Sequence, residues 1–198
     1  MVEPDWKQAR PATVSVERAW GPESFAQVAF AEPVLEELLA ELRTTHANGG
    51  AEFAQFSMSE DPTLDWFISR NRFSEIDLFG HLIRSGAFCA ALPRLRGQEN
   101  QEAFEWLWSS PYRLDGELAG ALMTGGAHGK FKKGGRAAKD LGGRFCAALF
   151  GDRFEEVPVL KTHRPWSGWF HEQDWDTTWL GVDKGRGTIW LLALTDAD

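Results

Sequence analysis

Cysteine is scarce in this sequence, with Cys89 and Cys146 the only two among 198 residues. Two cysteines do not make a disulfide framework, and no histidines accompany them at the spacing of a zinc site. Long hydrophobic runs are also missing, since no stretch approaches the roughly 18 apolar residues of a membrane span. We therefore expect a cytoplasmic protein with reduced thiols and no membrane partner.

Complete catalytic motifs are missing as well. Ser167 lies between Trp166 and Gly168, without the strand-to-helix elbow of a GxSxG hydrolase. Neither cysteine has an activating neighbour, and no Walker A or dinucleotide-binding glycine pattern occurs. These absences favour a non-enzymatic protein, although a triad assembled from distant residues would leave no local pattern.

Large aromatic side chains are abundant: ten Trp and fourteen Phe accompany a single Tyr. Such rings bury a large area with few rotatable bonds, so several Trp are expected to anchor a core. A chain of 198 residues is long enough to build that core without disulfides or metals. With no long linker or internal repeat, we expect a single domain over residues 1–198.

The order of the predicted elements indicates an α+β fold. Apolar spacing, caps and glycine stops predict helices at about 33–47, 61–68, 74–86, 99–108, 115–123 and 136–150. Short β-branched or aromatic runs predict strands at 12–20, 51–58, 157–162, 166–171, 175–183 and 188–196. A helix-rich part, about 33–150, would thus pack on a C-terminal antiparallel meander, about 157–196, joined by an early N-terminal strand.

The last two strands are predicted to form a hairpin, because Gly185 and Gly187 in the connection supply positive φ. Both strands are apolar on both faces, as expected of strands that are covered on two sides. A three-residue loop would place Asp176 opposite Asp196, whereas a four-residue loop would pair Asp176 with Thr195. The sequence leaves this register open.

The register matters because carboxylates flank the open end of the hairpin. If the carboxylates lie on one face of the hairpin, they would bind Mg²⁺ or Ca²⁺, or serve acid–base chemistry with a nearby histidine. If they are divided between the two faces, they would be ordinary solvated strand ends. No cofactor is expected other than such a cation. The catalytic candidates are His171, Asp174, Asp176 and Asp196, and the metal candidates are Asp174, Asp176, Asp196 and Asp198.

A glycine-rich basic segment at 125–135 leads directly into the helix expected from Arg136. Free backbone N–H groups at a helix N-terminus favour anions, so the segment is either an anion site or a mobile, solvated loop. The anion-binding candidates are His128, Lys130, Lys132, Lys133 and Arg136. In the aromatic stretch 164–171, Trp166 and Trp169 either present rings to a ligand or belong to the core.

The net charge of −8 argues against non-specific duplex binding and favours a basic partner. The first interpretation is therefore a small binding or inhibitor-like protein, of the immunity or antitoxin type, that neutralises a basic protein. One alternative is a metal-dependent hydrolase or phosphoryl-processing enzyme that uses the C-terminal carboxylates. Another is a nucleic-acid accessory domain that uses the basic glycine-rich loop.

Overall fold

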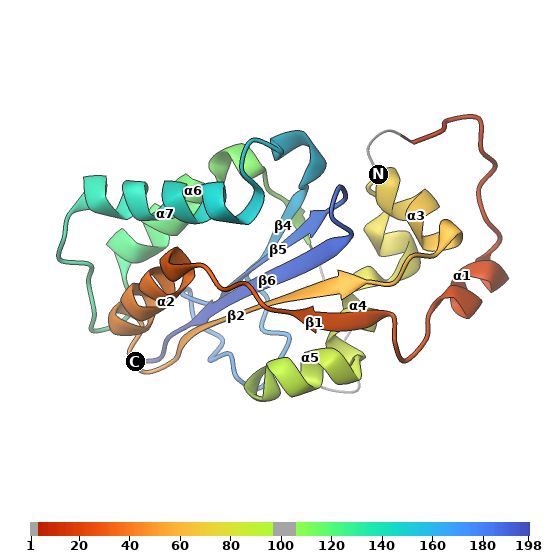
Figure 1. Cartoon of the computed structure of the whole chain (residues 1–198). Coiled ribbons are helices and arrows are strands. Elements are labelled where there is room, and N and C mark those ends of the chain that lie inside the picture. Colours follow the sequence, from red (N-terminus) through yellow and green to blue (C-terminus); the bar gives the residue numbers. More distant parts are fainter. Residues whose placement is uncertain (1–3, 97–105) are drawn as a thin grey trace.

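The computed structural model describes residues 4–96 and 106–198, and a six-stranded antiparallel sheet forms their centre (Figure 1). The strand order across the sheet is β1-β2-β6-β5-β4-β3. The strands are β1 (Phe25–Val28), β2 (Gly50–Met58), β3 (Leu107–Trp108), β4 (Val159–Thr162), β5 (Thr177–Asp183) and β6 (Thr188–Thr195). The apolar hairpin β5–β6 is thus central in the sheet, as its sequence predicts.

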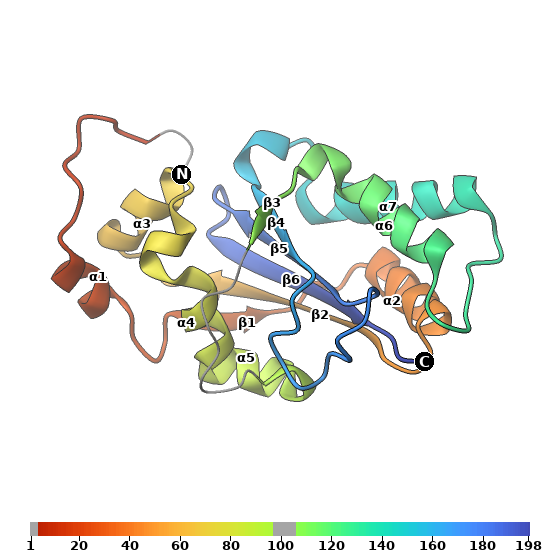
Figure 2. The same ribbon diagram turned by 180° about the vertical axis from the view of Figure 1, so that it is seen from behind.

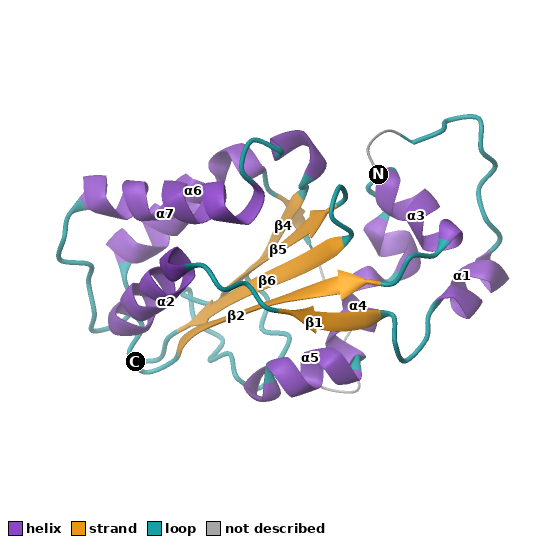
Figure 3. Ribbon diagram, viewed as in Figure 1, coloured by secondary structure: helices purple, strands orange, loops and turns teal. Residues whose placement is uncertain are grey.

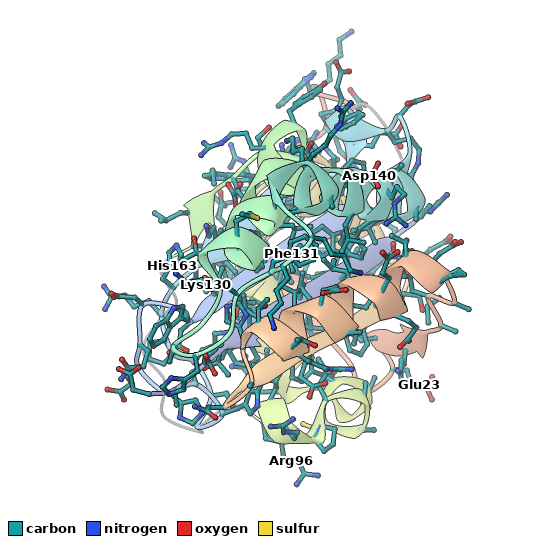
Figure 4. All side chains as sticks on the ribbon, turned by 90° about the vertical axis from the view of Figure 1, so that its left-hand side faces the viewer. Glu23, Arg96, Lys130, Phe131, Asp140 and His163 are labelled. Carbon is teal, nitrogen blue, oxygen red and sulfur yellow. The ribbon has the colours of Figure 1, made fainter. Side chains whose placement is uncertain are left out.

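Helices cover both faces of the sheet. One face carries α2 (Pro33–Thr45), α6 (Pro111–Thr124) and α7 (Gly135–Phe150), which face the viewer in Figure 4. The other carries α4 (Leu78–Arg84) and α5 (Gly86–Ala91), seen in front of the strands in Figure 2, with α3 (Pro62–Ser69) and α1 (Thr13–Ala19) beyond one end. Short 3₁₀ turns complete the connections: η1 (Phe73–Ile76), η2 (Pro93–Leu95) and η3 (Phe154–Glu156).

Each face of the sheet has its own hydrophobic core. On β5, Trp179 packs with the cluster under α2, α6 and α7, while Leu180 and Val182 join the cluster under α4 and α5. On β6, Trp190 and Leu192 alternate in the same way with Ile189 and Leu191. This alternation follows from the two-residue period of a strand, and it explains why the hairpin sequence is apolar throughout.

The α+β prediction is confirmed, and local signals placed several helices well (Figure 3). Pro33 starts α2, and the Asp61 side chain caps α3 by accepting hydrogen bonds from the N–H groups of Thr63 (2.7 Å) and Leu64 (3.1 Å). Of the helices in the described ranges, none has the length and apolar composition that a bilayer crossing requires.

Three predicted elements were wrong. The segment 12–20 contains helix α1, which buries Val16 and leaves Val14 about half exposed. The segment 166–171 is irregular, because Trp166, Trp169 and Phe170 all turn into one core cluster instead of alternating. Asp77 adopts a left-handed conformation (φ 44°), which divides the helix predicted at 74–86 into η1 and α4.

One predicted helix, 99–108, lies mostly outside the described residues, and its last two positions form strand β3 instead. The hairpin loop has four residues, since Asp183 pairs with Thr188 and Thr177 with Leu194. The second of the two registers left open by the sequence is therefore the one present.

Candidate functional site at the polar end of the sheet

Buried polar side chains gather at one end of the sheet, near the point marked C in Figure 1. Here α2 ends, β2 and β5 begin, and β6 ends, because Gly50 pairs with Thr195 and Thr177 with Leu194. We call this region the polar end. Its buried polar residues are Thr45, His46, Asp176, Thr177, Thr195 and Asp196.

Asp196 connects three parts of the chain at the polar end. Its Oδ1 accepts a hydrogen bond from the N–H of Asn48 and its Oδ2 one from the N–H of Ala127, both at 2.8 Å. The carboxylate is only 1% exposed, so these donors replace its hydration. Asp196 thereby fastens the end of β6 to the α2–β2 connection and to the glycine-rich segment.

Asp176 is satisfied in a similar way by its own neighbourhood. Its Oδ1 accepts a hydrogen bond from the Thr195 hydroxyl at 2.5 Å, and its Oδ2 one from the N–H of Gln173 at 3.2 Å. Because the four-residue loop places Asp176 beside Thr195, the next residue, Asp196, points to the opposite side. The two carboxylates are therefore divided between different hydrogen-bond networks.

The remaining acidic candidates lie at the surface. Asp174 and Asp198 are exposed, and within residues 4–96 and 106–198 the Asp174 carboxylate has no hydrogen-bond or ion-pair partner. His171 is exposed too. Over the same ranges, no group of three or more His, Cys, Asp or Glu side chains lies close enough to hold a metal ion. The structure thus does not assemble these residues into one acidic cluster.

The glycine-rich segment is fastened to the core along its first half. The N–H of Gly126 donates to the Thr45 carbonyl at 2.9 Å, and Phe131 is buried between α2 and the α6–α7 pair (Figure 4). A Cβ atom at Gly126 would lie 1.8 Å from Asp196 Oδ2, so only glycine permits this approach. The glycine at position 126 thus serves close packing against Asp196, and mobility of the rest of the segment stays a prediction.

The cations of this segment remain at the surface. Lys133 forms an ion pair with Glu41 at 2.6 Å. His128, Lys130, Lys132 and Arg136 are exposed and form no ion pair with any residue that the structure describes. Helix α7 begins next to them, after Gly134 at φ 86°. Anion binding by this set stays a prediction.

The two aromatic candidates belong to the core. Trp166 is fully buried, and its Nε1–H donates to the Thr178 hydroxyl at 2.8 Å. Trp169 is 9% exposed and packs against Phe170 in the same cluster. Neither ring offers an open face to a ligand in this structure.

A buried histidine, His46, lies at the polar end where α2 finishes. Its Nδ1 is 3.1 Å from the Leu42 carbonyl and 2.9 Å from the Thr45 hydroxyl, so we place the ring proton on Nδ1, donated to that carbonyl. Burial lowers the pKa of His46 below its usual value, against the hydrogen bond to Leu42 and the charge of Asp196, which both raise it. The imidazole is therefore neutral near pH 7.

The second nitrogen of His46, Nε2, has no hydrogen-bond partner among the described residues. The residue is 2% exposed and lines a small cavity of about 250 Å³, which we call the His46 groove. The groove lies between the polar end and helix α6. Its other lining residues include Glu117, Lys161, Asp174, Trp175 and Trp179.

Glu117 forms one wall of the groove and is held by several donors. Trp179 Nε1–H donates to it at 2.8 Å and the Ser109 hydroxyl at 2.9 Å, while Lys161 Nζ is 3.5 Å away. Burial alone would raise the pKa of Glu117, but these hydrogen bonds and the lysine charge outweigh it and lower the pKa. The wall therefore carries a fixed negative charge.

Sequence reasoning singled out only Asp174 among the lining residues of the groove. His46 gives a weak signal, a histidine between the end of a helix and an Asn-Gly-Gly stop, and its burial was not foreseeable. Glu117, Lys161 and Trp179 come from three separate elements, and no spacing in the sequence connects them. Comparisons with models of protein families, with curated proteins and with solved structures found no match for this chain.

Proposed function

We propose that this chain is a non-enzymatic binding protein that takes a lysine or arginine side chain of a basic protein partner into the His46 groove. The observation that carries the proposal is the free Nε2 of a buried, neutral imidazole on the groove wall. A neutral imidazole nitrogen without a proton accepts a hydrogen bond, so the groove suits a ligand that brings a donor.

The other groups of the groove also favour a cation. Among the lining residues, Glu117 and Asp174 bring two negative charges against the positive charge of Lys161, while Arg113, 3.8 Å from Glu117, lies outside the lining. The Lys161 ammonium already lies 5.4 Å from the centroid of the Trp179 ring, next to Glu117. An indole face beside a carboxylate stabilises ammonium and guanidinium groups, and Trp175 offers a second indole in the same cavity.

The net charge of −8 supports the same class of partner, because an acidic surface attracts a basic protein and speeds the encounter. An immunity-type or antitoxin-type protein that neutralises a basic partner is the form of this proposal that fits the sequence best. The hydrolase alternative gains less support, since the carboxylate oxygens of Asp176 and Asp196 already accept hydrogen bonds from within the chain.

The proposal is tested with short peptides as probes. Acetyl-Gly-Arg-Gly-amide is titrated into ¹⁵N-labelled protein, with the Glu and norleucine peptides of the same length as controls. We expect saturable shifts of the Trp175 and Trp179 indole signals with the arginine peptide alone. The pKa of His46 should fall further on binding, because a nearby cation disfavours the imidazolium form.

A matched pair of variants locates the binding. Asp174→Asn should weaken the arginine peptide about threefold, as expected for one exposed ion pair, and added salt should reduce this difference. Glu172→Gln removes a neighbouring exposed carboxylate outside the groove and should leave affinity unchanged. Equal responses to the arginine and glutamate peptides, or equal effects of the two variants, would contradict the proposal.

A further inference from the structure

The His46 groove continues at Asp174 into a second cavity, of about 640 Å³. Asp174 lines both cavities, so the two meet at this side chain. We call the second one the His163 cavity. It lies on the connection between β4 and β5, which begins at His163 (labelled in Figure 4), and its other lining residues are Pro165, Glu172 and Gln173.

The imidazole of His163 is held in the same way as that of His46. Its Nδ1 is 3.1 Å from the Asp176 carbonyl and 3.1 Å from the Thr177 hydroxyl. A carbonyl only accepts, so in the neutral ring the proton lies on Nδ1, and Nε2, which has no hydrogen-bond partner among the described residues, is left as an acceptor. Thr177 also lines the His46 groove, so the same short segment supports both cavities.

The acceptor in the groove is open to a ligand. Within the described ranges, the unpartnered side-chain nitrogens that are sealed from water are three indole N–H groups, those of Trp106, Trp169 and Trp190. Nε2 of His46 is unpartnered and is not one of them, although the residue as a whole is 2% exposed. A donor that enters the groove can therefore reach this atom.

Two carboxylates without partners lie where the cavities meet. Glu172 and Asp174 are both exposed, and neither forms a hydrogen bond or ion pair through its carboxylate with any residue in 4–96 or 106–198. A donor on Nε2 of His163 would lie in the same cavity as both carboxylates. The His163 cavity thus repeats the combination found in the groove, an imidazole acceptor beside negative charge.

The charges along the joined cavities match more than one cation. Glu117 joins the two exposed carboxylates in the lining, and the ammonium of Lys161 is the positive charge there. Two arginines lie near but outside the lining: Arg113, which is 3.8 Å from Glu117, and Arg164, which lines a separate hollow with Leu107. The negative charge around Asp174 is therefore the part of this surface that is left for a ligand.

We propose that the His46 groove and the His163 cavity together bind one segment of the basic partner that carries two lysine or arginine side chains. This inference rests on the proposed function, because the first cation occupies the groove. The second lies between Glu172 and Asp174 and donates a hydrogen bond to Nε2 of His163. Side chains two positions apart in an extended segment point to the same side, about 7 Å from each other, so we expect a basic-x-basic pattern.

Two peptides of equal length test the inference at pH 8, where a solvated imidazole is neutral. Acetyl-Gly-Arg-Gly-Arg-Gly-amide carries both cations, whereas acetyl-Gly-Arg-Gly-Gln-Gly-amide carries one. Both should shift the Trp175 and Trp179 indole signals, and the two-arginine peptide should bind about fivefold more tightly, the value of one favourable exposed ion pair. It alone should shift the ¹⁵N signal of His163 Nε2.

A matched pair of variants assigns the gain to the His163 cavity. Glu172→Gln should weaken the two-arginine peptide about threefold and leave the one-arginine peptide unchanged. Glu155→Gln removes an exposed carboxylate from η3, outside both cavities, and should affect neither peptide. His163→Phe should reduce the gain as well, while His171→Phe, an exposed histidine that lines neither cavity, should not. Should His163→Phe disturb the connection, the Glu172 comparison still decides.

The outcomes separate this inference from the proposal on which it rests. If neither peptide shifts the Trp175 and Trp179 signals, the groove itself does not bind a cation and both are overturned. If the one-arginine peptide binds but the second arginine adds nothing, or if Glu172→Gln and Glu155→Gln act equally, only the two-cation inference is overturned. Spermidine carries ammonium groups without a peptide backbone, and tighter binding of spermidine than of the two-arginine peptide would overturn the assignment to a protein segment.

Discussion

Replacing Asp196 by Asn tests the arrangement of the polar end most directly. The two side chains have the same shape, but the amide has one acceptor oxygen in place of two. Asp196 accepts one backbone hydrogen bond on each oxygen, from Asn48 and from Ala127. In the variant, one of these N–H groups would face an NH₂ group and lose its acceptor in a site that is 1% exposed.

The expected loss of stability follows from the two backbone hydrogen bonds that Asp196 accepts. The surviving hydrogen bond loses its charged acceptor and weakens by about 1 kcal/mol, and the orphaned N–H costs about 1–3 kcal/mol. We therefore expect the free energy of unfolding to fall by about 3 kcal/mol. With a urea m-value of about 3 kcal/mol/M at the upper end for small proteins, the midpoint would decrease by about 1 M.

Urea unfolding followed by tryptophan fluorescence measures this change. The matched control is Asp174→Asn, an exposed carboxylate with no partner in the described chain, which should alter stability by less than about 0.5 kcal/mol. Gly126→Ala provides an independent approach, because its Cβ would displace the same carboxylate. If Asp196→Asn unfolds within about 0.2 M of wild type, or if exchange of the Asn48 and Ala127 amides is unchanged, the reasoning is refuted.

Three further predictions concern buried titratable groups. Arg153→Met leaves the buried Asp183 without the two hydrogen bonds at 2.5 and 2.6 Å that pair it, and should cost about 3 kcal/mol in the same urea assay; a loss below 1 kcal/mol contradicts this. Burial raises the pKa of Cys146 to about 12, so in Cys89→Ser protein at pH 8 its reaction with Ellman's reagent should follow the unfolding curve. The lowered pKa of His46 means that the unfolded chain binds a proton that the native state excludes. Stability should therefore rise from below the native pKa of His46 up to about pH 6.5, and the rise should be smaller in His46→Gln; an unchanged slope would contradict the assignment.

Local signals accounted for the elements that were predicted correctly. The Asp61-Pro62 start of α3 needs only a side-chain cap and a fixed φ, both of which act within one turn. Strand β1 escaped prediction because its four residues become a strand only by pairing with β2. Helix α1 was mistaken for a strand because two valines, Val14 and Val16, are too few to distinguish a strand from a short helix. Packing against the rest of the fold decides between the two structures.

The candidate sites were less accessible to sequence reasoning than the fold. Asp174 was selected for its position near the other C-terminal carboxylates, yet the structure places it in the lining of the His46 groove together with Glu117 and Lys161. The cavity of about 330 Å³ lined by residues of η1, α4, the β3 edge, β4 and β5 was not foreseen at all, because these elements are far apart in the sequence. A cavity is a property of surfaces brought together, and no local pattern encodes it.

The sequence by itself determined the class of fold, the central position of the β5–β6 hairpin and its coverage on both faces, because periodicity and caps act over a few residues. Only the tertiary structure decided the one-residue choice of hairpin register, which separates Asp176 from Asp196. It alone also decided that Asp196 binds the backbone and that His46 keeps a free nitrogen on a groove. The physical reason is that these outcomes depend on contacts between segments up to about 150 positions apart, whose energies are set by packing and desolvation of the whole chain.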